Sequence, residues 1–299
     1  MKNLIIKATL SALMAQVIFG FSFMFTKIAL ENASVFTVIA DRYIIAFISL
    51  SILMLFNKTR IKLSKNIWKL VLMSLFQPIL YFLFESYGIK MTTSGFSAVM
   101  ISLIPVVSMF GGIFFLKEVP SVLQYCFTAL SVLGVAVMTF SSKADGTVSL
   151  LGVMLLLGAV ISSVAYNIMS RKISDEFSPL ERTYAMTLIG LLIFVLIAFV
   201  ENVNNPVNII IHFKDLSYTT AILYLGIVSS VVAFLFLNYA NTYLPVAKTT
   251  VFSNITTVIS VVAGILFLDE KFDVVTVVST IMIIVGVWGV QILDVKKKN

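Results

Sequence analysis

The sequence has very few of the residues from which metal centres and redox sites are built. Its 299 residues include one cysteine and one histidine. With Cys126 alone, neither an intrachain disulfide nor a thiolate zinc site can form. With His212 alone, which is expected in a loop, metal sites and proton relays built from several histidines are excluded as well.

Motifs for nucleotide binding and for common hydrolytic chemistry are absent too. The chain contains no Walker A sequence or other glycine-rich phosphate loop, no HExxH and no GxSxG. ATP-driven transport within this chain is therefore not supported. We expect a protein that is not an enzyme and carries no cofactor.

Charged residues are scarce, and apolar residues take their place. The charged fraction is 12% and the apolar fraction 60%, with a mean hydropathy of +1.06. Soluble domains contain about 25% charged residues, so lipid must be the solvent of this chain. The net charge of +7 is what the cytoplasmic loops of a membrane protein carry. Nucleic acid is therefore not an expected partner.

Ten apolar runs are long enough to cross a bilayer, which takes about 20 residues. The first run follows Lys2 and Lys7. It is too long for the apolar region of a signal peptide and lacks a clear cleavage site, so we expect a retained helix. The ten predicted spans are 8–30, 35–56, 67–88, 92–116, 121–140, 149–170, 180–200, 216–239, 244–268 and 273–293.

The distribution of lysine and arginine orients these spans. With the N-terminus in the cytoplasm, fourteen basic residues fall on the inner side and six on the outer side, with Lys248 inside a span. Cytoplasmic loops carry the excess of positive charge. The sequence therefore predicts a multi-pass protein of the cell membrane with both termini in the cytoplasm.

An internal repeat sets the predicted fold. Residues 87–140 align without a gap over residues 239–292, an offset of 152, and GIFFLKE at 112–118 returns as GILFLDE at 264–270. The aligned segments cover spans four and five, and nine and ten, so one unit has five helices. An odd number of spans reverses the second copy in the membrane. We predict an all-α polytopic membrane protein with ten transmembrane helices, as two inverted five-helix repeats at 1–145 and 146–299. A repeat of this kind is typical of transporters.

Several short motifs resemble those of a known family. They are FGFSFMFTK at 19–27, Arg42, YGIK at 87–90, TTS at 92–94, SLIP at 102–105 and FLKE at 115–118. With these motifs the chain resembles, over its whole length and in two copies, the EamA family of the drug/metabolite transporter superfamily. The resemblance implies ten helices around a central cavity and the export of amino acids, other small metabolites or drugs.

The sequence departs from the family pattern in two places. Phe19 stands where the family commonly has tryptophan, and Thr257 stands in the second copy at the position of Pro105. The first departure loosens inferences about contacts of span one. The second indicates that the two halves are not mechanically identical.

Arg42 and its neighbour Asp41 are the first candidates for substrate binding or coupling. An ionisable side chain inside a span costs about 2.5–3.5 kcal/mol. Arg42 lies about two turns inside span two and shares a face with Ala46 and Ser49. Its guanidinium could hold a carboxylate or phosphate bidentately. The alternative is a structural pair with Asp41, Glu31 or a helix end.

Two further charged candidates lie where one half departs from the other. Glu85, near the outer end of span three, aligns with Leu237, and it could bind a proton or a substrate ammonium. The alternative is an interfacial acid near Lys90. Lys248, near the cytoplasmic end of span nine, aligns with Phe96. It either takes part in the substrate pathway or extends its amine to the membrane interface.

The remaining candidates are uncharged. Gln77 and Asn254 are central enough to line a cavity, although such groups often only join helices. Tyr81 carries a polar tip. Pro78 and Pro105 lack a backbone donor and are predicted hinges in spans three and four, unless they serve packing alone.

We therefore expect a secondary transporter that exports a small metabolite by alternating access. Its energy would come from the substrate gradient or from proton antiport through Glu85. The alternatives are an uncoupled facilitator or channel and, with only scattered acids to support it, a membrane enzyme. The expected partners are a small-molecule substrate and the lipid bilayer, with a homodimer as one assembly.

Overall fold

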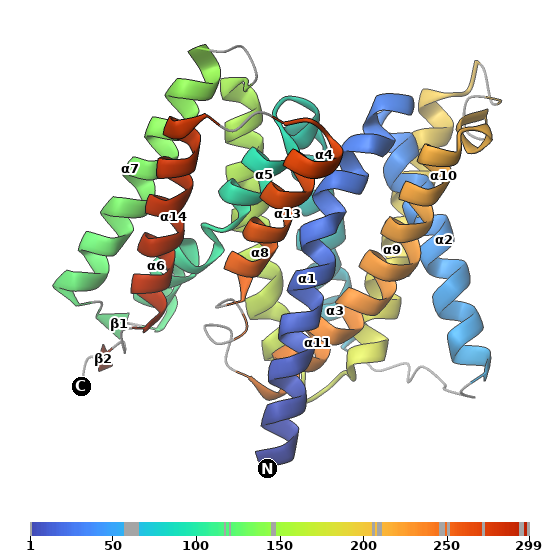
Figure 1. Ribbon diagram of the computed structural model, residues 1–299. Helices are drawn as coiled ribbons and strands as arrows, with labels where there is room; N and C mark the ends of the chain where they lie inside the picture. Colours follow the sequence, from blue (N-terminus) through green and yellow to red (C-terminus); the bar gives the residue numbers. More distant parts are fainter. Residues whose placement is uncertain are drawn as a thin grey trace.

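The computed structural model is a bundle of apolar helices (Figure 1). Within the part of the chain that it describes, seven helices are long and apolar enough to cross a membrane, and three shorter apolar helices complete the ten predicted spans. The predicted fold class is therefore confirmed. The described residues are 2–56, 66–116, 118–119, 121–144, 148–204, 207, 211–244, 249, 252–270, 273–292 and 296–297.

The first five spans end with a long helix at one side of the bundle. α3, the wide helical segment η1 and α4 together form the third span, and α5 and α6 form the fourth. The elements are α1 (Lys2–Asn32), α2 (Val35–Phe56), α3 (Ile67–Ser74), η1 (Leu75–Leu80), α4 (Tyr81–Lys90), α5 (Ser94–Ile101), α6 (Ile104–Leu116), β1 (Glu118–Val119) and α7 (Val122–Ala144).

The last five spans follow the same plan. α10, the wide segment η4 and α11 form one span, and α13 lies within the predicted span 244–268. Lys248 lies outside the described residues. The elements are α8 (Leu150–Lys172), α9 (Pro179–Glu201), η3 (Ile211–Lys214), α10 (Leu216–Leu223), η4 (Tyr224–Ala233), α11 (Phe234–Tyr243), α13 (Ser253–Phe267), α14 (Val274–Ile292) and β2 (Lys296–Lys297).

Both predicted hinge prolines lie where a span is interrupted. Gln77 has an extended backbone (φ −147°, ψ 114°) inside the third span, and the Gln77–Pro78 peptide bond is cis. Pro105 is the second residue of α6, after a break that separates α6 from α5. A proline is tolerated in the first turn of a helix because its missing N–H would have no partner there. That these breaks move during transport stays a prediction.

The contact between α7 and α14 displays the inverted repeat directly. These last helices of the two halves lie side by side (Figure 1). A Cβ on Gly134 would come within 3.0 Å of the Ser279 carbonyl oxygen, and one on Gly286 within 2.6 Å of the Phe127 carbonyl oxygen. Gly134 and Gly286 occupy the same repeat position, and so do Phe127 and Ser279. The two helices therefore pack through a pseudo-twofold contact that requires glycine on both sides.

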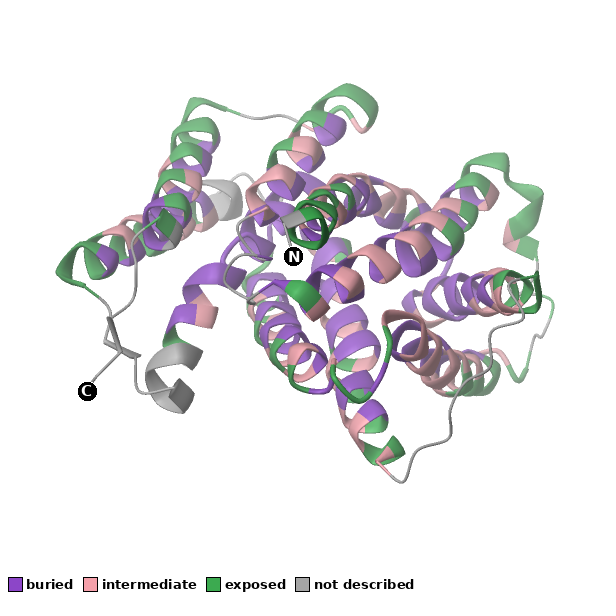
Figure 2. Ribbon diagram, turned by 90° about the horizontal axis from the view of Figure 1, so that it is seen from below, coloured by how far each residue is buried: buried purple, intermediate pink, exposed green. Residues whose placement is uncertain are grey.

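Both chain ends lie at the same end of the bundle, as an even number of spans requires (Figure 1). There β1 pairs with β2 antiparallel, with Glu118 opposite Lys297, so α7 begins where α14 ends. We call this the terminal end and the opposite one the remote end. The inner faces of the helices are buried and their outer faces exposed (Figure 2), as expected for helices surrounded by lipid.

An ion pair joins the two halves at the terminal end. Lys69 of α3 contacts the carboxylate of Glu176, which lies in the turn between α8 and α9. Hydrogen bonds from Lys69 and Asn66 hold the pKa of the Glu176 carboxyl below its ordinary value. Both side chains are partly exposed, so the pair is worth little to stability.

We predict that Gly286→Ala destabilises the fold by about 1–3 kcal/mol, because the added methyl meets backbone atoms of α7 that no side-chain rotation can move. Gly158→Ala is the matched control, since the atoms nearest to its methyl belong to the side chain of Phe84 and not to a backbone. The measurement is the temperature at which the detergent-solubilised protein loses its monodisperse gel-filtration peak. Equal temperatures for the two variants would contradict the packing argument.

Candidate functional site

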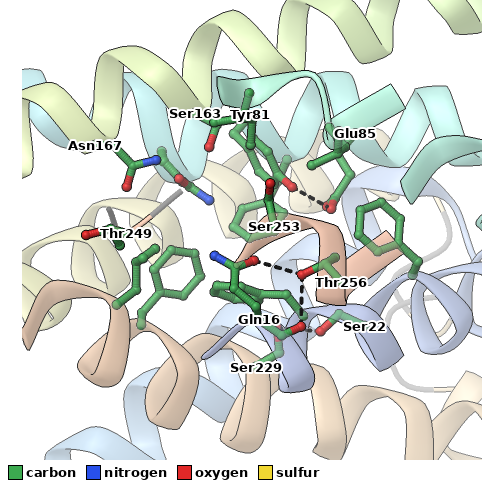
Figure 3. Close-up of a pocket in the computed structure, with 18 of the residues that line it drawn as sticks. Gln16, Ser22, Tyr81, Glu85, Ser163, Asn167, Ser229, Thr249, Ser253 and Thr256 are labelled. Atoms are coloured by element: carbon green, nitrogen blue, oxygen red, sulfur yellow. Dashed lines mark hydrogen bonds between the residues drawn. The ribbon is translucent and has the colours of Figure 1, made fainter. Parts of the chain in front are cut away.

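A small cavity of about 50 Å³ lies at the centre of the bundle. Its wall combines aromatic and aliphatic side chains with polar ones from both halves (Figure 3). α1, α4, α8, α11 and α13 each contribute residues three or four positions apart, which share one helical face. The polar residues of the wall are Gln16, Ser22, Arg42, Gln77, Tyr81, Glu85, Ser163, Asn167, Ser229, Thr249, Ser253 and Thr256.

The repeat relates the two walls of this cavity to each other. Five pairs of residues separated by the repeat offset both line it, which places the cavity on the pseudo-twofold axis. One of these pairs is charged on one side only. The pairs are Gln77 and Ser229, Phe82 and Phe234, Glu85 and Leu237, Ile101 and Ser253, and Ile104 and Thr256.

Arg42 is held in the wall by hydroxyl groups of η4. Its Nε donates to Ser230 Oγ at 2.7 Å and one terminal nitrogen to Ser229 Oγ at 2.9 Å. The guanidinium carbon lies 4.0 Å from the centre of the Phe82 ring, a favourable cation–π contact. The side chain is 3% exposed. The hydrogen-bond and ring contacts of this charge are therefore all with neutral groups.

Glu85 is the buried acid of the same wall. Tyr81 lies one turn earlier on α4, and its hydroxyl donates to Glu85 Oε1 at 3.0 Å. Glu85 Oε2 is buried with no hydrogen-bond partner among the described residues. A buried carboxylate oxygen without a donor is costly, so this atom is a ready acceptor for a ligand donor or a proton.

Arg42 and Glu85 attract each other electrostatically, but neither forms an ion pair with a described residue. Within the described ranges, no acid lies within 4.0 Å of the Arg42 guanidinium and no base within 4.0 Å of the Glu85 carboxylate. A buried charge usually has a partner of opposite sign. The cavity thus presents a cation and an anion that both retain the capacity to bind.

Uncharged pairs connect α1 to the second half around this space. Thr256 donates to the Gln16 side chain at 2.7 Å, and Ser22 donates to Ser229 at 2.8 Å. Figure 3 shows these four residues across the space from Tyr81 and Glu85. The Gln77 side-chain oxygen is buried without a described partner, which leaves a further acceptor.

The predicted site residues separate into two groups. Arg42, Gln77, Tyr81 and Glu85 line the cavity. Five others lie off its described wall or outside the described residues, and the roles of all nine stay predictions. These five are Asp41, Asn254, Pro78, Pro105 and Lys248.

Asp41 and Asn254 both lie off the cavity wall. Asp41 is buried, and its carboxylate accepts the Tyr218 hydroxyl at 2.6 Å. It therefore joins α2 to α10 and does not pair with Arg42. Asn254 is half-buried, while its neighbour Ser253 faces the cavity.

The serines and threonines of the wall were not predicted, namely Ser22, Ser163, Ser229, Thr249, Ser253 and Thr256. Such hydroxyls are common in transmembrane helices, where many bond their own backbone. The pairing of Ser229 with Gln77 across the repeat was the one signal available in the sequence.

A second buried arginine, Arg182, serves a different purpose. It donates to the backbone oxygens of Ser170 and Asn238 at 2.9 and 2.8 Å and to the side chains of Ser170 and Thr242. These contacts tie α8, α9 and α11 together. Arg182 is absent from the cavity wall.

The arrangement defines a class: a multi-pass membrane protein in which two inverted five-helix repeats enclose a polar cavity on their shared axis. A family model described as the EamA-like transporter family matches residues 6–140 and 150–292. The chain belongs to this family and is a transporter. Its resemblance to the family, inferred from short motifs, is thereby confirmed.

Relatives in bacteria and archaea support the assignment. The chain is 31% identical to the uncharacterized transporter YcxC of Bacillus subtilis, covering 98% of this chain and 95% of the relative. An uncharacterized transporter of Archaeoglobus fulgidus is 23% identical, with coverage of 90% and 93%. A solved crystal structure with 17% identity and a TM-score of 0.65 covers 96% of this chain and 98% of its own, which supports the fold.

We predict that Arg182→Met lowers the stability of the solubilised protein by about 1–3 kcal/mol, because it leaves buried backbone oxygens without donors. Arg42→Met should cost less, because its partners are hydroxyls that can turn to other acceptors. Thermal unfolding of both variants in the same detergent is the measurement. A larger loss for Arg42→Met would show that Arg42 is chiefly structural.

Proposed function

We propose that this protein is a secondary transporter that exports a small zwitterionic metabolite, of the amino acid type, by alternating access. One observation carries the proposal. Arg42 and Glu85 line one buried cavity, and neither has an ion-pair partner among the described residues. A substrate that carries both charges would neutralise both groups at once.

The chemistry of each group favours one end of such a substrate. A guanidinium matches a carboxylate through parallel hydrogen bonds, so Arg42 would receive the acid group. Glu85 Oε2, which has no donor among the described residues, would accept from the ammonium. Phe19, Phe82 and Phe234 of the wall provide an apolar surface for the rest of the molecule.

Binding requires that the cavity changes size. A volume of about 50 Å³ accommodates a few water molecules, since one water needs roughly 10–15 Å³. Ligand pockets occupy about 300–1,000 Å³. The two halves must therefore separate on one side to admit a substrate, which is the movement that inverted repeats permit. This requirement favours a carrier over a channel.

Glu85 is our proposed coupling group. When the substrate leaves, the Glu85 carboxylate loses its contact with the substrate ammonium and stays buried. A proton can then bind the carboxylate and neutralise it. Exchange of proton for substrate at one carboxylate gives antiport. With the charge distribution of the loops, we propose a bacterial-type cell membrane, cytoplasmic termini and outward transport of the substrate.

The substrate class is tested with matched ligands. Amino acids of several sizes are screened by thermal shift, since a bound ligand raises apparent stability. The best ligand is then compared with its amide, which lacks the carboxylate, and with its deamino acid, which lacks the ammonium. We expect each analogue to bind roughly tenfold or more weakly, as expected for the loss of a hydrogen bond between charged groups.

Two variants test which residue binds the carboxylate of the substrate and which binds its ammonium. Arg42→Ala should remove the preference for the acid over the amide, and Glu85→Gln the preference for the amine over the deamino acid. Binding of the amide and the amino acid with equal affinity by the unmodified protein would refute the role of Arg42.

For transport, we predict that Glu85→Gln abolishes the response of flux to an imposed pH gradient in proteoliposomes while substrate counterflow continues. The amide keeps the size of the carboxylate but accepts no proton. The control is Glu31→Gln, which replaces an exposed glutamate outside the cavity. Full proton-coupled flux in Glu85→Gln would eliminate the coupling role, and absence of saturable counterflow in the unmodified protein would indicate a channel.

A further inference from the structure

A seam between the two halves separates the cavity from the remote end of the bundle. α5 of the first half packs along α13 of the second. Ser260 Oγ contacts the Ser94 carbonyl oxygen at 3.3 Å, and Thr257 donates to the Ala98 carbonyl oxygen at 3.2 Å. α5 runs from Ser94 at the remote end to Ile101 at the cavity wall, about 10 Å at 1.5 Å per residue.

The remote edge of this seam is fastened by a carboxylate. Glu270 follows α13, and its two oxygens accept the backbone N–H groups of Ser94 at 2.6 Å and Gly95 at 3.0 Å. These are donors at the start of a helix, which have no partner inside the helix and favour negative charge. Thr93 caps the next donor, that of Phe96, from within the first half. The first half thus depends on the second for the remaining caps.

The turn after α13 is shaped to deliver this carboxylate. Asp269 has a left-handed backbone (φ 52°), which turns the chain back, and the Glu270 N–H donates to the Gly264 carbonyl oxygen at 3.1 Å. A Cβ on Gly264 would lie 2.6 Å from Glu270 Oε2 and 3.2 Å from Ser94 Oγ. Glycine at this position is therefore required for the contact.

Two hydroxyl contacts of this seam have no counterpart at the same repeat positions among the described residues of the first half. Ser108 corresponds to Ser260, yet its hydroxyl is buried without a partner among the described residues. Pro105 corresponds to Thr257 and has no hydroxyl. Glu118 corresponds to Glu270, and its backbone pairs with Lys297. The described hydroxyl contacts of the remote seam therefore belong to one half of the repeat alone.

We propose that Glu270 is a latch: its carboxylate on the start of α5 holds the cavity shut at the remote end, and its release is a required step of opening there. The inference rests on the proposed alternating-access function. Glu270 acts between the halves and touches no substrate. Lys27 of α1 donates to the Ile89 and Thr92 carbonyl oxygens in the turn before α5, and its positive charge also attracts the Glu270 carboxylate.

The test measures access to the cavity from each end. In a Cys126→Ser background, Ile101→Cys places a single thiol on the cavity wall. A membrane-impermeant maleimide is applied separately to right-side-out and inside-out vesicles. Because release of the latch favours the state open at the remote end, Glu270→Ala should raise labelling from that side roughly tenfold. Glu270→Gln, which keeps one acceptor oxygen and loses the charge, should give an intermediate rate.

Two further variants separate the latch from general effects. Gly264→Ala displaces the carboxylate without altering its charge and should reproduce the effect of Glu270→Ala. Asp269→Asn removes a neighbouring negative charge, and asparagine tolerates the left-handed backbone, so it should leave the rate unchanged. All variants are compared by gel filtration, and Gly264→Ala and Glu270→Gln carry the test if Glu270→Ala does not fold.

The proposal is overturned if the folded latch variants label at the parent rate, or if Asp269→Asn raises the rate as much as Glu270→Ala. Labelling does not depend on transport. Counterflow of the best ligand in the same vesicles is measured in parallel. Its absence would refute the proposed function while the labelling rates still decide whether Glu270 closes the remote end.

Discussion

The structure depends on one constraint: inside a bilayer, a polar backbone group finds no water and must be satisfied by the protein or face a wet cavity. Both described interruptions of the first half obey it. The side chain of Gln77 lines the cavity at the break in the third span, and Ile101 and Ile104 flank it at the break in the fourth. The breaks therefore mark where the cavity lies, because an interruption facing lipid would be far more costly.

The same constraint separates the two buried arginines. Arg182 donates hydrogen bonds to backbone oxygens of two helices. These donors join the helices and are not free to bind a ligand. Arg42 rests on two serine hydroxyls and one aromatic ring, partners that can be replaced by a stronger acceptor. Sequence position distinguishes them poorly, since both are arginines near the start of an apolar run. Their partners, which come from distant segments, decide which arginine remains available.

The sequence predicted the ten spans and the repeat because hydropathy and a gapless alignment are local signals. It also singled out Arg42 and Glu85, because a charge inside a span is conspicuous. It could not show that Asp41 bonds to Tyr218, since that contact joins residues 177 positions apart. The hydroxyl wall was equally hidden, because serine and threonine in a transmembrane helix are common and only the fold determines which of them face the cavity.

The two halves have the same helix packing but contribute different kinds of side chain to the cavity. Gly134 and Gly286 make equivalent contacts, and Phe82 and Phe234 occupy equivalent walls. Yet both described charges of the cavity, Arg42 and Glu85, belong to the first half, while the second contributes hydroxyls, one amide and apolar side chains such as Leu237. A substrate held by charge would therefore stay with the first half while neutral, easily exchanged contacts to the second half break and form. In the proposed function, the symmetry of the halves would supply the movement, and its loss at Glu85 and Leu237 would decide which half carries the substrate.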